Sequence, residues 1–206
     1  YLEDTANIHC LLEFADRGTL FQHLKVLGDA GMKEGQAAPL FGGTAAGLAY
    51  LHSLRIVHRD LKPENILLFG PELVPKIADF GWCVELTEEE PTRLTFCGTL
   101  DYLAPEMLKQ EPHDIGIDLW ALGVLLYEIL LARAPFASKS QKESMEMICA
   151  VRFDLPSGRL TQGAEELIRS LLVKRISDRM PLAKVLRHPW LKSGSVVGTG
   201  SRGEPG

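Results

Sequence analysis

Apolar residues recur every three or four positions along much of the chain, which is the spacing of one face of an α-helix. In the second half, this spacing predicts helices over residues 116–132, 140–150, 161–173 and 181–187. Nearer the start, Leu20, Leu24 and Leu27 predict a helix over residues 19–27. A helix is also expected over residues 36–54, although a proline and three glycines weaken it. The chain is therefore expected to be mostly helical.

Short apolar runs separated by turn residues occupy the remaining segments. Residues 8–14 form an apolar run suited to a buried strand, and Asp16-Arg17-Gly18 ends it. Residues 55–82 are interrupted by prolines and glycines, which indicates loops and short strands. The acidic stretch 85–90 is expected to be an exposed loop. Residues 192–206 are rich in glycine and serine and are expected to form a disordered tail.

The composition is that of an ordinary globular domain. With 206 residues, 46% hydrophobic and 24% charged, one domain with a real core is expected. The net charge of −5 argues against nucleic acid or an anionic membrane as the main partner. The apolar run over residues 115–132 contains two acids and is too short to span a bilayer. Because the chain starts at Tyr1 and not at methionine, a fragment or processed product is expected.

The four cysteines lie far apart in the sequence and form no CxxC pair. They are Cys10, Cys83, Cys97 and Cys149. This spacing favours free thiols in a reduced, intracellular setting, with neither a disulfide framework nor a zinc site.

Three short motifs follow one another in the middle of the chain. They read His-Arg-Asp-Leu-Lys-Pro-Glu-Asn over residues 58–65, Asp-Phe-Gly over residues 79–81 and Ala-Pro-Glu over residues 104–106. One triplet alone would mean little, but the three in this order resemble the signature set of the protein kinases.

The resemblance assigns a role to each polar side chain in these motifs. Transfer of a phosphoryl group from ATP needs in-line positioning and neutralisation of charge more than covalent chemistry. Asp60 would orient or accept the proton of the substrate hydroxyl, and Lys62 would neutralise the moving phosphate. Asn65 and Asp79 would supply oxygen ligands to Mg²⁺, a hard cation. The alternative is that Asp60 and Asp79 are ordinary solvated loop acids.

Narrower features resemble the Aurora family of serine/threonine kinases. They are Trp82 after the second motif and the sequence Cys-Gly-Thr-Leu-Asp-Tyr-Leu over residues 97–103, and the similarity extends from Tyr1 to about Leu191. Lys62 and Thr99 resemble serine/threonine kinases, in which these positions differ from tyrosine kinases. Ala104 departs from the family, since animal Auroras usually have proline there.

The resemblance implies an α+β protein-kinase fold. Residues 1–18 would be a remnant of the small-lobe strands and the hinge. Residues 19–191 would form the mainly helical large lobe, with the catalytic loop at 58–65 and the activation segment at 79–106. Neither a GxGxxG loop nor a Val-Ala-x-Lys strand occurs in residues 1–50. The chain by itself is therefore expected to transfer very little phosphate.

The same resemblance labels the residues around the nucleotide. Leu12 would be the gatekeeper, Glu13, Phe14 and Ala15 the hinge, and Leu67 and Ala78 neighbours of the adenine and the metal. The implied ATP-binding residues are Leu12, Glu13, Phe14, Ala15, Glu64, Asn65, Leu67, Ala78 and Asp79. For Leu12, Leu67 and Ala78, plain core packing is the alternative interpretation.

Regulation and substrate choice also follow from the resemblance. Thr95 stands at the position of an activating phosphosite, and Arg59 at that of a phosphate-binding arginine; an unmodified exposed loop threonine is the alternative for Thr95. Glu64 and Glu128 align with acids that bind a substrate arginine, although Glu128 could instead be a structural helix acid. Because residues 93–96 read Arg-Leu-Thr-Phe, we expect autophosphorylation of Thr95 in trans and a preference for Arg-x-Ser/Thr-hydrophobic sites.

Other residues are expected to be structural. Asp118 would accept hydrogen bonds from the catalytic-loop backbone, Glu106 and Arg179 would form an ion pair, and Thr99 would support the site. His52 and His113 are expected to be surface or satisfied histidines. Cys97 could be an exposed thiol whose oxidation blocks peptide binding, or an inert, partly buried cysteine.

Two functions remain open on the sequence alone. The first is an Aurora-like mitotic kinase that uses ATP and Mg²⁺ and acts at the nucleus, centrosome, spindle or chromosomes. Its partners would be protein substrates and spindle or centromere activators, with neither nucleic acid nor membrane. The second is a truncated, non-catalytic binding module that offers a peptide groove.

Overall fold

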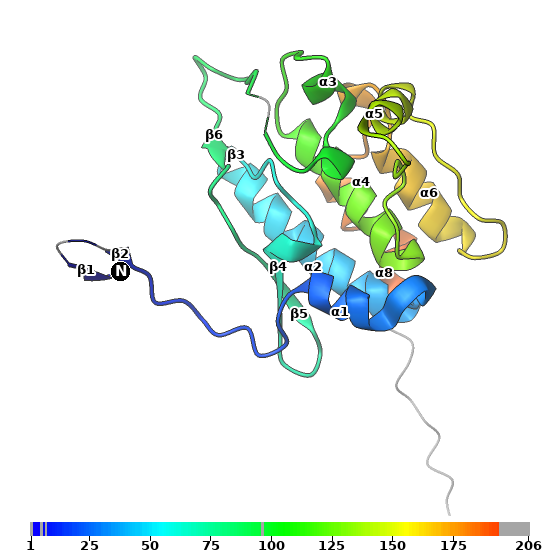
Figure 1. Cartoon of the computed structure of the whole chain (residues 1–206), viewed down its shortest axis with the longest axis horizontal. Helices are drawn as coiled ribbons and strands as arrows, with labels where there is room; N and C mark the ends of the chain where they lie inside the picture. Colours follow the sequence, from blue (N-terminus) through cyan, green and yellow to red (C-terminus); the bar gives the residue numbers. More distant parts are fainter. Residues whose placement is uncertain (1, 5, 7, 96, 194–206) are drawn as a thin grey trace, which may run out of the picture.

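The computed structural model of the chain describes residues 2–4, 6, 8–95 and 97–193 (Figure 1). Helices dominate it. The α-helices are α1 (Leu20–Leu27), α2 (Glu34–Ser53), α3 (Pro105–Leu108), α4 (Gly116–Leu131), α5 (Gln141–Ala150), α6 (Gln162–Leu171), α7 (Leu182–Val185) and α8 (Pro189–Ser193). Short 3₁₀ helices are η1 (Gly28–Ala30), η2 (Pro63–Asn65), η3 (Leu100–Tyr102) and η4 (Ile176–Asp178).

Six short strands form three separate antiparallel pairs. The strands are β1 (Leu2–Glu3), β2 (Ile8–His9), β3 (Ile56–Val57), β4 (Ile66–Phe69), β5 (Val74–Ile77) and β6 (Val84–Glu85). β1 pairs with β2, β3 with β6, and β4 with β5. In the β4–β5 hairpin, Ile66 lies opposite Ile77 and Phe69 opposite Val74.

Most predicted helices are confirmed, and local chemistry explains their ends. Thr19 caps α1 with its hydroxyl, which accepts from the N–H of Gln22. In turn, the side-chain oxygen of Gln22 accepts from the N–H of Thr19. The helix predicted over 181–187 is shorter, because α7 ends at Val185 and Pro189 opens α8. Lys192 and Ser193 belong to α8, and the rest of the expected disordered tail lies outside the described residues.

Gly43 of α2 has a packing function. A side chain at Gly43 would place its Cβ 2.7 Å from Pro75 of β5, so this position lets the hairpin approach the helix closely. The weak helix propensity of this segment is therefore offset by its contact with β5.

The buried strand predicted over residues 8–14 is wrong. Only Ile8 and His9 are in a strand, and the side chains of Leu12 and Phe14 are 79% and 84% exposed. β2 pairs only with the two-residue β1 among the described residues, and a ribbon of that size has no face on which to bury an apolar run. In Figure 1 this segment runs away from the helices.

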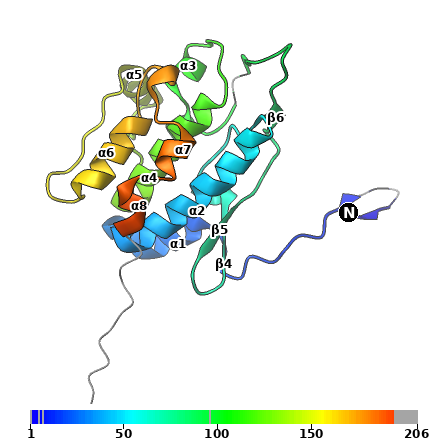
Figure 2. The ribbon, with the colours of Figure 1, turned by 180° about the vertical axis from the view of Figure 1, so that it is seen from behind.

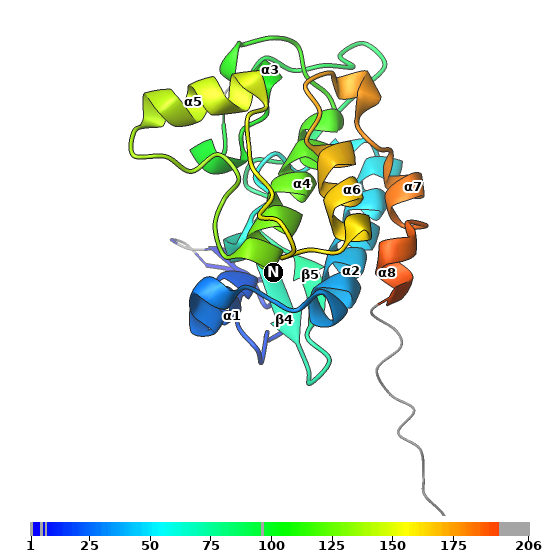
Figure 3. The same cartoon turned by 90° about the vertical axis from the view of Figure 1, so that its right-hand side faces the viewer.

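The core is built around α4. Every residue of α4 except Glu128 is buried, which explains why this helix is apolar on all sides. α4 packs against α2 and α6, as Figure 3 shows. No helix in the described ranges is long and apolar enough to cross a membrane.

One carboxylate ties three distant helices together. Glu34 at the start of α2 accepts hydrogen bonds from the N–H and the hydroxyl of Thr161, which caps α6, at 2.7 and 2.6 Å. It also accepts from the indole N–H of Trp190 in α8 at 2.6 Å. The segment between β3 and β4 carries the His-Arg-Asp motif, and a hydrogen bond from His58 to Asp118 holds it against the start of α4.

Candidate active site

The buried carboxylate of Asp118 fixes the backbone of the His-Arg-Asp motif. Its Oδ2 accepts from the N–H of His58 at 2.8 Å, and its Oδ1 accepts from the N–H of Arg59 at 2.9 Å. Oδ2 also accepts from Nε2 of His52 at 2.9 Å. Arg59 is held at φ +69°, a left-handed conformation that is strained for a residue with a side chain. Asp118 therefore positions the residue that follows, Asp60.

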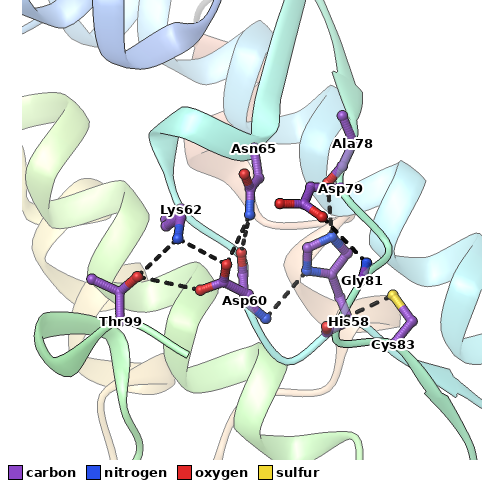
Figure 4. Close-up of polar contacts among 9 residues, drawn as sticks. All are labelled: His58, Asp60, Lys62, Asn65, Ala78, Asp79, Gly81, Cys83 and Thr99. Carbon is purple, nitrogen blue, oxygen red and sulfur yellow. Dashed lines mark hydrogen bonds and ion pairs between the residues drawn. The ribbon is translucent and has the colours of Figure 1, made fainter. Parts of the chain in front are cut away.

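Three side chains contact the buried carboxylate of Asp60 (Figure 4). Lys62 Nζ lies 2.8 Å from Oδ2, and Nδ2 of Asn65 donates to the same oxygen at 3.1 Å. The hydroxyl of Thr99 donates to Oδ1 at 3.3 Å and accepts from Lys62 Nζ at 2.9 Å. Asn65 Nδ2 donates also to the backbone oxygen of Asp60, at 2.8 Å. The carboxylate is thereby held in a single orientation.

The orientation of the Asn65 amide follows from its partners. Both groups that it contacts on Asp60 are oxygens that can only accept, so Nδ2 must face them and Oδ1 must point away. Figure 4 shows the Asp79 carboxylate pointing toward Asn65, and the N–H of Ala78 donates to the backbone oxygen of Asn65 at 2.8 Å. Asp79 is exposed and has φ +60°. Two side chains with oxygen atoms, one neutral and one acidic, thus lie beside Asp60.

The segment after Asp79 is anchored at several points. Arg93 exchanges two backbone hydrogen bonds with His113, at 2.8 and 3.0 Å. A Cβ at Gly98, which has φ +99°, would lie 2.9 Å from the backbone oxygen of Arg59, so only glycine allows this close passage. Thr95 is exposed, and Nε of Arg59 donates to the backbone oxygen of Trp82.

Glu106 and Arg179 form a bidentate ion pair with N–O distances of 2.6 and 2.7 Å. Arg179 also donates to the backbone oxygens of Gly116 and Val173. The guanidinium thus connects the Ala-Pro-Glu motif to the start of α4 and to the end of α6.

Three acidic residues near Tyr102, namely Glu64, Asp101 and Glu128, form an acidic cluster. The hydroxyl of Tyr102 donates to Oε2 of Glu128 at 2.6 Å. Burial raises the pKa of Glu128, the Tyr102 hydrogen bond opposes that shift, and the negative charges of Glu64 and Asp101 add to it. Burial and the neighbouring Glu128 likewise raise the pKa of Tyr102 well above its usual range.

Comparison with known proteins decides the family. Residues 1–191 match the family model described as protein kinase domain. The chain belongs to the protein kinase family. Three relatives are Aurora kinase C of Mus musculus and the Aurora kinases of Encephalitozoon cuniculi and Debaryomyces hansenii. Each is 40% identical to this kinase chain, over 195, 195 and 192 residues respectively.

The aligned regions cover 95%, 93% and 93% of the kinase chain in the same order. They cover 68%, 69% and 46% of the relatives, so the chain spans about half to two thirds of their length. The resemblance to Aurora kinases and the α+β kinase fold are both confirmed.

The kinase structure brings only some of the implied ATP-binding residues together. Asn65, Ala78 and Asp79 lie side by side, as described above, and Leu67 is a half-buried neighbour in β4. Glu64, beside Asn65, is exposed. Leu12 and Phe14 point into solvent and form no wall of an adenine pocket among the described residues.

The rest of the implied hinge also lies in the segment that runs away from the helices. Glu13 forms an exposed ion pair with Lys76, and Ala15 is half-buried. Both therefore lie outside the cluster around Asp60.

The donor set of the kinase fits Mg²⁺ shared with a nucleotide. Mg²⁺ is usually held by one or two protein oxygens, and water and phosphate oxygens complete its coordination. Oδ1 of Asn65 and the carboxylate of Asp79 are such oxygens. In the described ranges no three His, Cys, Asp or Glu side chains form a closed metal cage.

The structure tests the sequence-based expectations for a cysteine and two histidines in and around the kinase site. Cys97 is buried and not exposed, and burial raises the pKa of its thiol, as the inert alternative requires. His52 is satisfied by Asp118, as expected. The expectation for His113 holds only in part: it is buried, its Nδ1 donates to the backbone oxygen of Glu111 at 3.3 Å, and its Nε2 has no hydrogen-bond partner in the part of the chain that the structure describes.

Sequence reasoning missed the roles of Gly98 and Tyr102 in this kinase. Both lie in the 97–103 motif that carries the Aurora resemblance, and that motif could have pointed to them. Phe96, the hydrophobic residue after Thr95, lies outside the described residues.

Proposed function

We propose that the complete gene product containing this chain transfers the γ-phosphoryl group of MgATP to serine or threonine hydroxyls of proteins. The orientation of the Asp60 carboxylate by Lys62, Asn65 and Thr99 supports this proposal most strongly. Aurora kinases are 40% identical to the chain, which supports the same reaction.

Each side chain has one part in the transfer. The substrate hydroxyl attacks the γ-phosphorus, the bond from that phosphorus to the ADP oxygen breaks, and the hydroxyl proton passes to the Asp60 carboxylate. Lys62, held by Asp60 and Thr99, neutralises charge on the moving phosphoryl group. Asn65 and Asp79 would hold Mg²⁺, which neutralises the phosphate oxygens when it is bound.

The 206-residue chain alone should transfer very little phosphate. The hinge side chains Leu12 and Phe14 are exposed, and the sequence has no GxGxxG loop over residues 1–50. Nucleotide would then contact only the floor of a site, with its phosphates largely in water. A non-catalytic binding module remains the competing function for this chain alone.

We propose a substrate preference for arginine two residues before the acceptor. Glu128, Glu64 and Asp101 influence one another electrostatically, and no cation forms an ion pair with them among the described residues. A partly buried carboxylate beside like charges is unfavourable, and an incoming guanidinium relieves that cost.

Autophosphorylation of Thr95 in trans is part of the same proposal. Thr95 is exposed, and Arg93 precedes it by two residues. Among the described residues, Nε of Arg59 donates to the backbone oxygen of Trp82, and no hydrogen bond joins Arg59 to Thr95. A phosphate on Thr95 would give the Arg59 guanidinium a stronger acceptor and draw the two segments together.

Aurora membership also supports a proposal about cellular role. We place the protein in mitosis, at the nucleus, centrosome, spindle or chromosomes, with protein substrates and spindle or centromere activators as partners.

The metal requirement tests the proposed reaction. We would follow transfer of labelled γ-phosphate from ATP to an Arg-x-Thr-hydrophobic peptide by the complete gene product. Transfer should stop on chelation of Mg²⁺ and fall strongly in Asp79→Asn, while the exposed-site control Asp29→Asn keeps full activity. Transfer that survives chelation, or equal activity of the two variants, would contradict the proposal.

A further inference from the structure

A groove of about 610 Å³ opens where the end of α2, the start of α4, η4 and α7 meet. Figure 2 shows α7 beside α2 on this side of the molecule. Ala49, Leu119, Ile176 and Leu182 form apolar parts of its wall, and Leu186 is a partly exposed residue of the same lining. Its volume lies in the range of small-molecule sites, which are mostly apolar with a few polar groups.

The arginine in the groove wall, Arg179, already has hydrogen-bond and ion-pair partners within the chain. Arg179 contacts both oxygens of Glu106 and the backbone oxygens of Gly116 and Val173. Its guanidinium is therefore neutralised and has little capacity left for a ligand.

Besides the hydroxyls of Ser53 and Ser177, the groove lining offers a ligand two acceptors, one on His52 and one on Asp114. Nε2 of His52 must donate to Asp118, because a carboxylate oxygen can only accept, so Nδ1 of the neutral ring is an acceptor. Nδ1 has no partner among the described residues. Asp114 accepts the N–H of Gly116 at 2.8 Å with one oxygen, and no cation pairs with this carboxylate in the described ranges.

We propose that this groove binds a small amphipathic molecule with an aromatic or branched apolar body and a protonated amine. The apolar body packs against Leu119, Ile176 and Leu182, and the amine donates to Asp114 and to Nδ1 of His52. A negative carboxylate without a cation partner, next to an apolar wall, is complementary to such a molecule in both charge and polarity.

The site is coupled to the catalytic loop by one side chain. His52 in the groove donates to the same Asp118 oxygen that holds the N–H of His58, and the other oxygen holds the N–H of Arg59. A ligand on His52 therefore acts on the backbone that precedes Asp60. Binding itself does not depend on phosphoryl transfer, so it can be tested separately from the proposed function.

The binding experiment uses the 206-residue chain and two indole probes of the same shape. Tryptamine carries a protonated amine, and indole-3-ethanol carries a neutral hydroxyl. Because a charge-assisted hydrogen bond is stronger than a neutral one, we expect tryptamine to bind about tenfold more tightly by calorimetry. Equal affinities, or no binding of either probe at millimolar concentration, would overturn the proposal.

Matched variants locate the probe. Asp114→Asn keeps the acceptor for the Gly116 N–H and removes the charge, so it should abolish the advantage of tryptamine. Ala183→Trp places an indole in the groove from the exposed surface of α7 and should block both probes. Lys184→Trp, one residue along and outside the groove, should leave both affinities unchanged. Unaltered binding in Ala183→Trp would contradict the assigned site.

Backbone resonances test the coupling. Tryptamine should shift the amide signals of His58 and Arg59 in wild type and leave them unmoved in Ala183→Trp. If tryptamine binds with the predicted charge dependence but these two amides do not shift, the site stands and the coupling to the catalytic loop is refuted.

Discussion

Glu106 and Arg179, which are 73 residues apart in the chain, form a buried bidentate ion pair with side chains 5% and 0% exposed. Glu106 lies in α3 at the end of the proposed activation segment, and Arg179 follows η4. The pair therefore connects a segment that would receive the substrate to the stable helical body.

Breaking this pair should cost much stability. Glu106→Gln leaves the buried guanidinium without its counter-charge, and we expect a loss of about 3–5 kcal/mol in unfolding free energy, measured by urea denaturation. Glu111→Gln is the matched control, because it removes the same charge from an exposed pair with Lys109 and should cost less than about 1 kcal/mol. Equal losses would contradict the buried ion pair.

The raised pKa of Glu128 predicts a pH-dependent stability. The native state holds this proton more tightly than the unfolded chain does. The stabilisation is fully present below the unfolded pKa, near 4.5, and is lost as the pH rises through the raised native pKa. Glu128→Gln cannot ionise and still accepts from Tyr102, so it should be more stable than wild type at pH 7.

Unfolding free energies over a pH series test this sign. The advantage of Glu128→Gln should shrink as the pH falls to 4, and Glu146→Gln, at an exposed site in α5, should show no such trend. A Glu128→Gln variant less stable than wild type at pH 7 would contradict the prediction.

The thiols should differ widely in reactivity. Burial raises the pKa of Cys83 to about 11 and also raises that of Cys97, whereas Cys10 is exposed. Only the thiolate reacts, so at pH 8 iodoacetamide should modify Cys10 at least about tenfold faster than the other two, by peptide mass spectrometry. Equal rates are expected only in urea. Rapid native modification of Cys97 would revive the oxidation hypothesis.

The sequence predicted most of the helical body, because a helix reveals its buried face by local spacing. The start of the chain was mispredicted for the opposite reason. Whether the apolar run that contains Leu12 and Phe14 is buried depends on partner strands elsewhere, and the run itself carries no information about them. The burial of His113 was also missed, because its backbone pairs with that of Arg93, which lies 20 residues earlier in the chain.

The candidate site was predictable in residue type but only partly in geometry. The motifs named Asp60, Asn65 and Asp79, and the structure brings these three together. The contact between Tyr102 and Glu128 could not be read from the chain, because it joins residues 26 apart on η3 and α4. The groove beside His52 was likewise hidden, since four elements form it.

Substrate peptides test the acidic cluster. For the complete gene product, kcat/KM should be about 10- to 100-fold higher for a peptide with arginine than with alanine two residues before the threonine, because charge-assisted hydrogen bonds contribute about 1.5–3 kcal/mol. Glu128→Gln should reduce that preference, and Glu146→Gln should keep it. If Glu128→Gln slows both peptides equally, Glu128 is a structural acid.

The most direct measurement compares phosphoryl transfer by the complete gene product with that of its Asp60→Asn variant. Asparagine keeps the shape of the side chain but cannot take the hydroxyl proton, so kcat should fall by about 10²–10⁴-fold while the protein remains folded. Asp29→Asn, at an exposed position in η1, should retain full activity. If Asp60→Asn transfers phosphate as fast as Asp29→Asn does, the cluster around Asp60 is not the catalytic site.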